Sequence, residues 1–157
     1  MRAFLSYSLD DHRMFVVTLL ARRLKERGFR IINGEYNATN EIDEMSARKI
    51  DICSLFIGII SVDGQFSERV RKEWQLAVSK NIPALLFVED TLSVSPSLDR
   101  HPNVIRFNRY KPEAAISKIK LNLSKPTKVG NSAQDAAAWV LGGSALIALV
   151  KLLAVEE

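Results

Sequence analysis

Glu73 is the residue whose type and spacing point most directly to chemistry. It lies in a predicted helix, residues 67–80, at the flank of the buried stripe that about 100° per residue assigns to Val70, Trp74, Ala77 and Val78. A carboxylate partly withdrawn from water has its charged form disfavoured, and the raised pKa that follows is common among catalytic acids and bases. The same spacing also allows a purely structural role, in which Glu73 pairs with Arg69 one helical turn earlier.

Several other catalytic and cofactor patterns are absent from the sequence. No GxGxxG follows the first apolar run, no GxxxxGK[ST] occurs, and there is no GxSxG elbow. The third apolar run ends in Ser61 and not in an aspartate that would accept a phosphoryl group. Cys53 is the single cysteine and leaves no Cys/His cluster for zinc. We therefore expect neither a metal site nor a bound cofactor.

The composition is that of one ordinary globular domain. The chain has 157 residues, of which 47% are hydrophobic and 25% charged, and this excludes disordered, collagen-like and disulfide-framework proteins. Its net charge of +4 is modest, and the basic residues are spread without the aromatic interleaving typical of nucleic-acid platforms. We expect no nucleic-acid partner, and the single cysteine indicates a reducing compartment.

Short apolar runs alternate with amphipathic segments from residue 3 to residue 123. The apolar runs predict strands at residues 3–7, 29–32, 54–60, 84–88 and 104–107. The amphipathic segments predict helices at residues 10–27, ended by Gly28, and at residues 41–50, 67–80 and 112–123. Continuous apolar strands between helices favour an α/β fold, a flavodoxin-like doubly wound parallel sheet of five strands in the order 2-1-3-4-5.

In that architecture ligands bind beyond the carboxyl ends of the strands, where the strand order reverses between the first and third strands. Residues 7–11 and 61–73 are therefore the segments expected to line a binding crevice. Ser67 is expected to cap the helix that carries Glu73. Glu73 itself falls in the second turn of that helix and points toward the predicted crevice.

The chain changes character near residue 124. Residues 124–132 form a basic linker, and residues 133–157 contain a run of fifteen positions, 136–150, without a charge. Beyond Lys151 the apolar run continues to Val155, so that residues 136–155 predict a helix of twenty residues, long enough to cross a bilayer. The lysines before it would keep the domain in the cytoplasm at the inner face of the cell membrane. The alternative is a soluble helix that packs on the domain or on other copies. Small residues at Ala138, Gly142, Ser144 and Ala148 favour self-association in either case.

Three segments resemble the TIR (Toll/interleukin-1 receptor) domain family. The run Phe4-Leu5-Ser6-Tyr7-Ser8 with Asp11 resembles the family's opening strand motif, and residues 50–61 resemble its helix end, turn and aliphatic strand closed by a serine. Residues 67–73, followed by Pro83 and an aliphatic strand, resemble the segment that carries the glutamate of NAD-cleaving TIR domains. The resemblance covers residues 1–123, the predicted TIR-like domain.

The resemblance implies a bacterial-type NAD glycohydrolase, which cleaves NAD, its substrate, to nicotinamide and ADP-ribose or a cyclic product. It implies that Glu73 is catalytic and that Tyr7 and Ser8 lie beside the nucleotide, with Ser61 and Ser67 as further substrate-binding candidates. It also implies self-association through the domain and an antiphage defence role activated by clustering. Arg69 stands where many members of the family have an aromatic residue.

Two other functions remain open from the sequence. One is a non-catalytic TIR adaptor that assembles partners through its surface, in which Glu73 is structural. The other is an enzyme similar to the nucleoside deoxyribosyltransferases, a related flavodoxin-like family in which a glutamate of the corresponding helix attacks the sugar.

Overall fold

Five parallel strands form a single sheet in a computed structural model of the chain, which describes residues 1–8, 15–34, 39–62, 64 and 67–116. The strands are β1 (Arg2–Ser6), β2 (Arg30–Ile32), β3 (Leu55–Ile60), β4 (Ala84–Glu89) and β5 (Val104–Phe107). Their order is β2-β1-β3-β4-β5, and every neighbouring pair is parallel. The predicted fold class, strand order and strand positions are confirmed.

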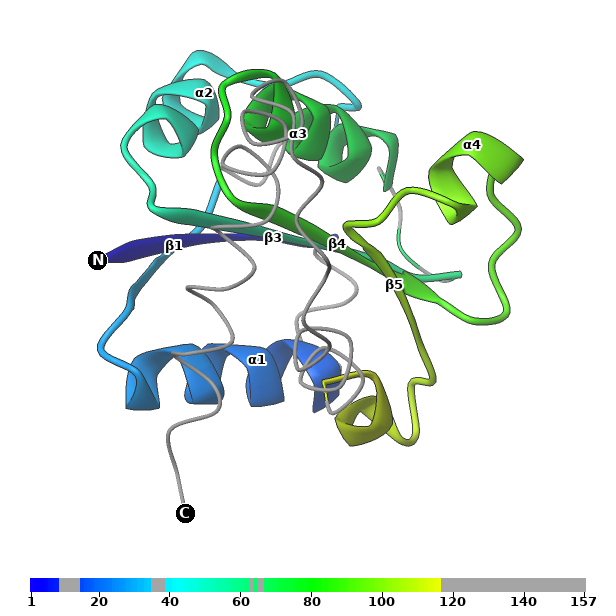
Figure 1. Cartoon of the computed structure of the whole chain (residues 1–157). Coiled ribbons are helices and arrows are strands. Elements are labelled where there is room, and N and C mark those ends of the chain that lie inside the picture. The colour runs from blue at the N-terminus through cyan, green and yellow to red at the C-terminus, as the bar shows by residue number, and fades with distance from the viewer. Residues whose placement is uncertain (9–14, 35–38, 63, 65–66, 117–157) are drawn as a thin grey trace, which may run out of the picture.

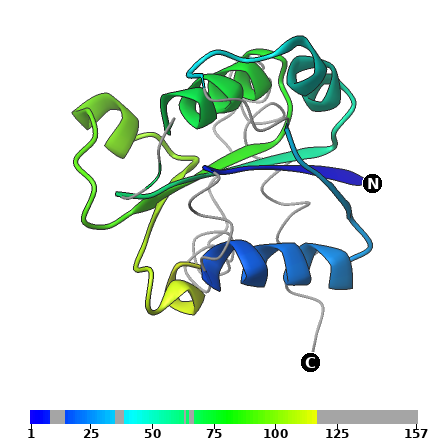
Figure 2. The same ribbon diagram turned by 180° about the vertical axis from the view of Figure 1, so that it is seen from behind.

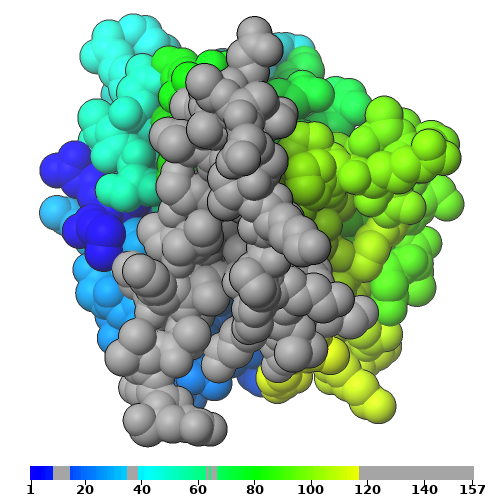
Figure 3. Space-filling model, viewed as in Figure 1, coloured from blue at the N-terminus to red at the C-terminus, as the bar shows by residue number. Residues whose placement is uncertain are grey.

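Helices cover both faces of this sheet (Figures 1 and 2). One face carries α1 (Phe15–Glu26) and the helical residues 112–116, and the other carries α2 (Glu44–Asp51) and α3 (Ser67–Ser79). In a space-filling view from the same side, α2 and the start of β1 lie along one edge and α4 (Pro96–Asp99) along the opposite edge (Figure 3). The pattern analysis missed α4, because one helical turn is too short to show a period.

The boundaries of α2 differ from the predicted helix at residues 41–50. Asp43 adopts an extended backbone and its side chain accepts a hydrogen bond from the backbone N–H of Ser46, which makes it the N-cap. The helix therefore begins at Glu44, and it ends at Asp51. An acidic residue at the cap position thus moves the start of the helix three residues beyond the first charged residue of the segment.

The strand period of two divides the core into two layers. On β1, Leu5 and Tyr7 pack in the cluster that α1 covers, whereas Phe4 packs in the cluster that α3 covers. The ring of Phe4 stacks on that of Phe56 from β3, with the ring centroids 5.5 Å apart. Consecutive residues of β1 therefore point to opposite faces of the sheet, and this alternation decides which of its side chains reach α1 and which reach α3.

The predicted linker and hydrophobic helix, residues 124–132 and 133–157, lie outside the described residues. The same holds for residues 10–14 and 117–123 of two predicted helices. Within the described ranges, none of the helices combines the length and the apolar character that a membrane span requires.

We expect Gly58→Ala to lower the free energy of unfolding by about 1–3 kcal/mol, the range for an overpacked core. A Cβ atom at Gly58 of β3 would lie 2.8 Å from Leu86 Cδ1 and 3.1 Å from Val70 Cγ1, and both side chains are fully buried. Urea unfolding measures the change. Gln75→Ala, on the exposed side of α3, is the control and should stay within about 0.5 kcal/mol. Equal stability of Gly58→Ala and the wild type would contradict this close packing.

Candidate functional site at the carboxyl end of the sheet

Glu73 lies on α3 against the carboxyl end of β1. The residue is 1% exposed, and its Oε2 accepts a hydrogen bond from the Oγ of Ser6, the last residue of β1. Ser6 is itself buried, so this contact is closed off from solvent. The helical position predicted that Glu73 leans inward, and the structure confirms that placement.

Arg69 gives the same carboxylate a positive partner. Its Nε lies 3.8 Å from Glu73 Oε1, and its Nη2 donates a hydrogen bond to the backbone carbonyl oxygen of Tyr7 at 3.2 Å. Both charged side chains are almost completely buried. The ion pair that sequence spacing offered as a structural alternative is therefore present, and it coexists with the placement of Glu73 at the expected crevice.

Gly34, two residues after β2, forms another wall beside the carboxylate. A Cβ atom there would lie 2.8 Å from the Oγ of Ser46 and 3.2 Å from Cζ of Phe4, so a side chain would crowd both groups, whereas its distance of 3.5 Å from Glu73 Oε1 is an ordinary contact. Ser46 is fully buried and donates a hydrogen bond to Asp43 Oδ2 at 2.6 Å. The N-terminus of α2 therefore lies close to the segment after β2 and to the Glu73 carboxylate.

The environment of Glu73 raises its pKa above the ordinary glutamate value. Burial makes the largest contribution because it disfavours the charged form, and the negative charge of Asp43 acts in the same direction. The Ser6 hydrogen bond and the positive charge of Arg69 oppose the rise in the Glu73 pKa without cancelling it. A carboxylate held in this way can accept hydrogen bonds from a ligand and stabilise positive charge that develops nearby.

The other residues predicted to line the crevice are only partly brought to Glu73. Ser8 is buried, and its Oγ finds no hydrogen-bond partner among the described residues. The Tyr7 side chain lies on the opposite face, where its hydroxyl accepts a hydrogen bond from Asn33 Nδ2 at 3.4 Å, and only its backbone reaches the Glu73 side. Ser61 is buried just after β3, and Ser67 begins α3 with a half-exposed side chain. Their substrate-binding roles stay predictions.

A second buried carboxylate, which the sequence analysis did not single out, ends β4. Glu89 accepts hydrogen bonds from Arg109 at 2.5 and 2.9 Å and from the backbone N–H of Val62 at 2.8 Å. The Arg109 hydrogen bonds are the main cause that lowers the pKa of Glu89, although burial acts against them. Glu89 therefore ties the segment after β3 to the segment after β5. In the sequence, the feature that could have pointed to Glu89 is its position as an acidic residue directly after an apolar run.

Comparisons with known proteins find a matching family and solved structures to which the chain is similar. The family described as TIR domain matches residues 3–120. A solved structure of the CMP N-glycosidase BcmB from Clostridium botulinum aligns with a TM-score of 0.54 at 19% identity, covering 77% of this chain and 99% of that one. The TIR domains of the activated Roq1 resistosome, which directly recognizes the pathogen effector XopQ, align with a TM-score of 0.45 at 17% identity, covering 99% and 84%. The comparison with curated proteins finds no match.

We expect the stability of the wild type to fall relative to Glu73→Gln as the pH rises above the ordinary pKa of glutamate. Because the pKa of Glu73 is raised in the folded state, the unfolded chain releases this proton at a lower pH than the folded protein. Ionisation therefore favours the unfolded chain, and the loss is complete once the pH exceeds the folded pKa. Urea unfolding at each pH gives the difference between the two proteins.

The matched control is Glu68→Gln, which removes a half-exposed carboxylate from the same helix. The raised pKa of Glu73 would be contradicted if the difference in free energy of unfolding between the wild type and Glu73→Gln stayed constant with pH. It would also be contradicted if that difference moved in favour of the wild type as the pH rises.

Proposed function

The chain belongs to the TIR domain family, and on that premise we propose that it is an NAD glycohydrolase that splits NAD into nicotinamide and ADP-ribose or a cyclic product. The observation that carries the proposal is the Glu73 carboxylate, buried on α3 and hydrogen-bonded to Ser6 at the carboxyl end of β1. The end of β1 adjoins β3, where the strand order reverses, and this is the position at which doubly wound sheets bind ligands.

In the proposed reaction the bond between the nicotinamide nitrogen and C1′ of the adjoining ribose breaks. The bonding electrons leave with nicotinamide, and positive charge develops on C1′ and the ring oxygen. Glu73 accepts hydrogen bonds from the ribose hydroxyls and stabilises that charge. Water then adds to C1′ and loses a proton to give ADP-ribose, whereas attack by another group of the same molecule gives a cyclic product.

The neighbours of Glu73 have distinct parts in this proposal. Ser6 holds Oε2 in one orientation, so the carboxylate does not need to be immobilised when the ribose arrives. Arg69 opposes the effect of burial and favours the ionised form that the reaction uses. Gly34 lies beside Oε1, the oxygen that a ribose hydroxyl would approach. With Glu73 1% exposed, the substrate must displace part of these surroundings to reach it.

We expect Glu73→Gln to reduce NAD turnover by at least about a hundredfold, because the amide cannot supply the negative charge that the developing cation needs. Ser6→Ala should cause a smaller loss, about tenfold, because the carboxylate stays but loses a hydrogen bond that orients it. Chromatography of the products of concentrated protein, with a crowding agent present, measures both effects. Glu68→Gln is the matched control and should retain turnover.

NAD turnover by Glu73→Gln at the wild-type rate would contradict the assignment of Glu73 as the catalytic residue. A wild-type protein that leaves NAD intact would favour a non-catalytic adaptor. CMP is included as a second substrate, because the CMP N-glycosidase of similar fold is named for cleaving the same class of bond. Cleavage of CMP alone would replace NAD with a nucleoside monophosphate as the substrate.

We also propose that residues 133–157 tether the domain to the inner face of the cell membrane and that clustering of copies activates it as an antiphage defence effector. The support is the uncharged run at residues 136–150 and the lysines that precede it. Removal of residues 133–157 should move the protein from the membrane fraction to the soluble fraction after sedimentation. The soluble fraction holding both forms would favour a helix that packs in an oligomer.

A further inference from the structure

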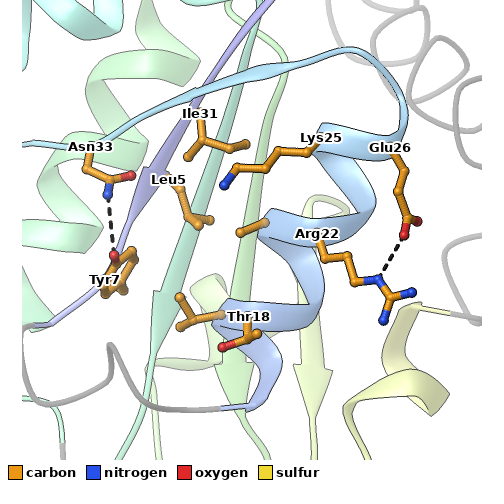
Figure 4. A pocket seen from close by; sticks show the side chains of 10 residues that line it. Leu5, Tyr7, Thr18, Arg22, Lys25, Glu26, Ile31 and Asn33 are labelled. Atoms are coloured by element: carbon orange, nitrogen blue, oxygen red, sulfur yellow. Dashed lines mark hydrogen bonds and ion pairs between the residues drawn. The ribbon is translucent and has the colours of Figure 1, made fainter.

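A pocket of about 680 Å³ lies on the α1 face of the sheet (Figure 4). Glu73 lies on the other face, with α3. Its apolar walls come from Leu5 of β1, Ile31 of β2, and Val17 and Ala21 of α1. Leu5 faces this pocket while the next residue, Ser6, bonds to Glu73, so the sheet itself separates the two sites. The volume is within the range of about 300–1,000 Å³ typical of small-molecule sites.

The pocket carries a positive charge. Lys25 extends from α1 across the pocket toward Ile31 and Leu5 (Figure 4), and within the described ranges its ammonium group has no acidic partner. Arg22, one turn earlier, already pairs with Glu26 at 2.8 Å. Lys25 is therefore the cation that remains available to a ligand among the described lining residues.

The pocket also offers a buried hydrogen-bond acceptor. Asn33 Nδ2 donates to the Tyr7 hydroxyl, and the Asn33 Oδ1 is buried without a partner among the described residues. In Figure 4 this oxygen lies on the side of the carboxamide that faces Leu5 and Ile31. A buried acceptor without a partner costs free energy, and a ligand N–H or O–H group would remove that cost.

We propose that this pocket binds a nucleoside monophosphate whose base carries an amino group. The planar base would lie over the partly exposed side chains of Ile31 and Ala21, with its amino group donating to Asn33 Oδ1. The phosphate would lie at Lys25, where the ammonium group supplies a charge-assisted hydrogen bond. Such a ligand combines, in one molecule of suitable size, the flat apolar body, the donor and the anion that the three parts of the pocket require.

The test is calorimetric titration of AMP into the full chain, with adenosine and inorganic phosphate titrated separately as the two halves of the probe. AMP should bind more tightly than either half. Lys25→Glu should weaken AMP binding by about tenfold or more, because a charge-assisted hydrogen bond becomes a repulsion. Asn33→Leu should weaken AMP and adenosine binding but leave phosphate binding unchanged. Lys111→Glu, an exposed lysine outside the pocket, is the matched control and should bind AMP like the wild type.

Titration of the Glu73→Gln variant separates this site from the proposed active site. The pocket predicts that Glu73→Gln binds AMP as the wild type does, whatever the outcome of the NAD assay. Loss of AMP binding in Glu73→Gln would place the ligand at Glu73 and overturn the inference. Absence of AMP binding by the wild type, or equal binding by the wild type and Lys25→Glu, would overturn it as well. Lys25 is exposed, so its substitution tests the pocket without threatening the fold.

Discussion

The burial of one carboxylate, that of Glu73, is the constraint on which the arrangement of the described domain depends. An ion taken out of water costs several kcal/mol unless its oxygens find partners, and here Ser6 and Arg69 provide them. Meeting that requirement fixes the end of β1 against the second turn of α3. Gly34, two residues after β2, lies beside the same carboxylate, and a side chain there would collide with the Oγ of Ser46, which a Cβ atom would approach to 2.8 Å. The local shape of the site follows from the cost of leaving Glu73 unpartnered.

Glu73 and Glu89 are two buried glutamates at the same edge of the sheet, and their different partners shift their pKa values in opposite directions. Glu89 receives two hydrogen bonds from Arg109 and one from a backbone N–H, and these partners lower its pKa. Glu73 has one hydroxyl and a more distant guanidinium, so burial dominates and raises its pKa. The first arrangement is that of a structural clamp between loops. The second leaves a carboxylate with unused capacity to accept hydrogen bonds, which a reaction can exploit.

The alternation of β1 explains why the two sites stay separate although a single strand builds both. Ser6 faces α3 and Glu73, whereas Leu5 and Tyr7 face α1 and the pocket. Tyr7 is shared through different atoms, because its hydroxyl meets Asn33 and its carbonyl oxygen meets Arg69. A strand buried on both faces can therefore serve two chemistries with consecutive residues, and the sheet keeps their ligands apart.

The sequence by itself determined the five strands, their parallel order and the inward lean of Glu73, because buried positions recur along the chain with the period of the helix or strand that contains them. It did not reveal α4, the Glu89 clamp or the face to which Tyr7 points. The spacing of i and i+4 offered Arg69 as a partner of Glu73, but only the tertiary structure decided that Ser6 meets this carboxylate, since Ser6 lies 67 residues away along the chain. Such contacts depend on strand register and on the seating of α2 and α3, which are set by the packing of the whole core. Local pattern therefore predicts which residues are buried, and packing decides what they are buried against.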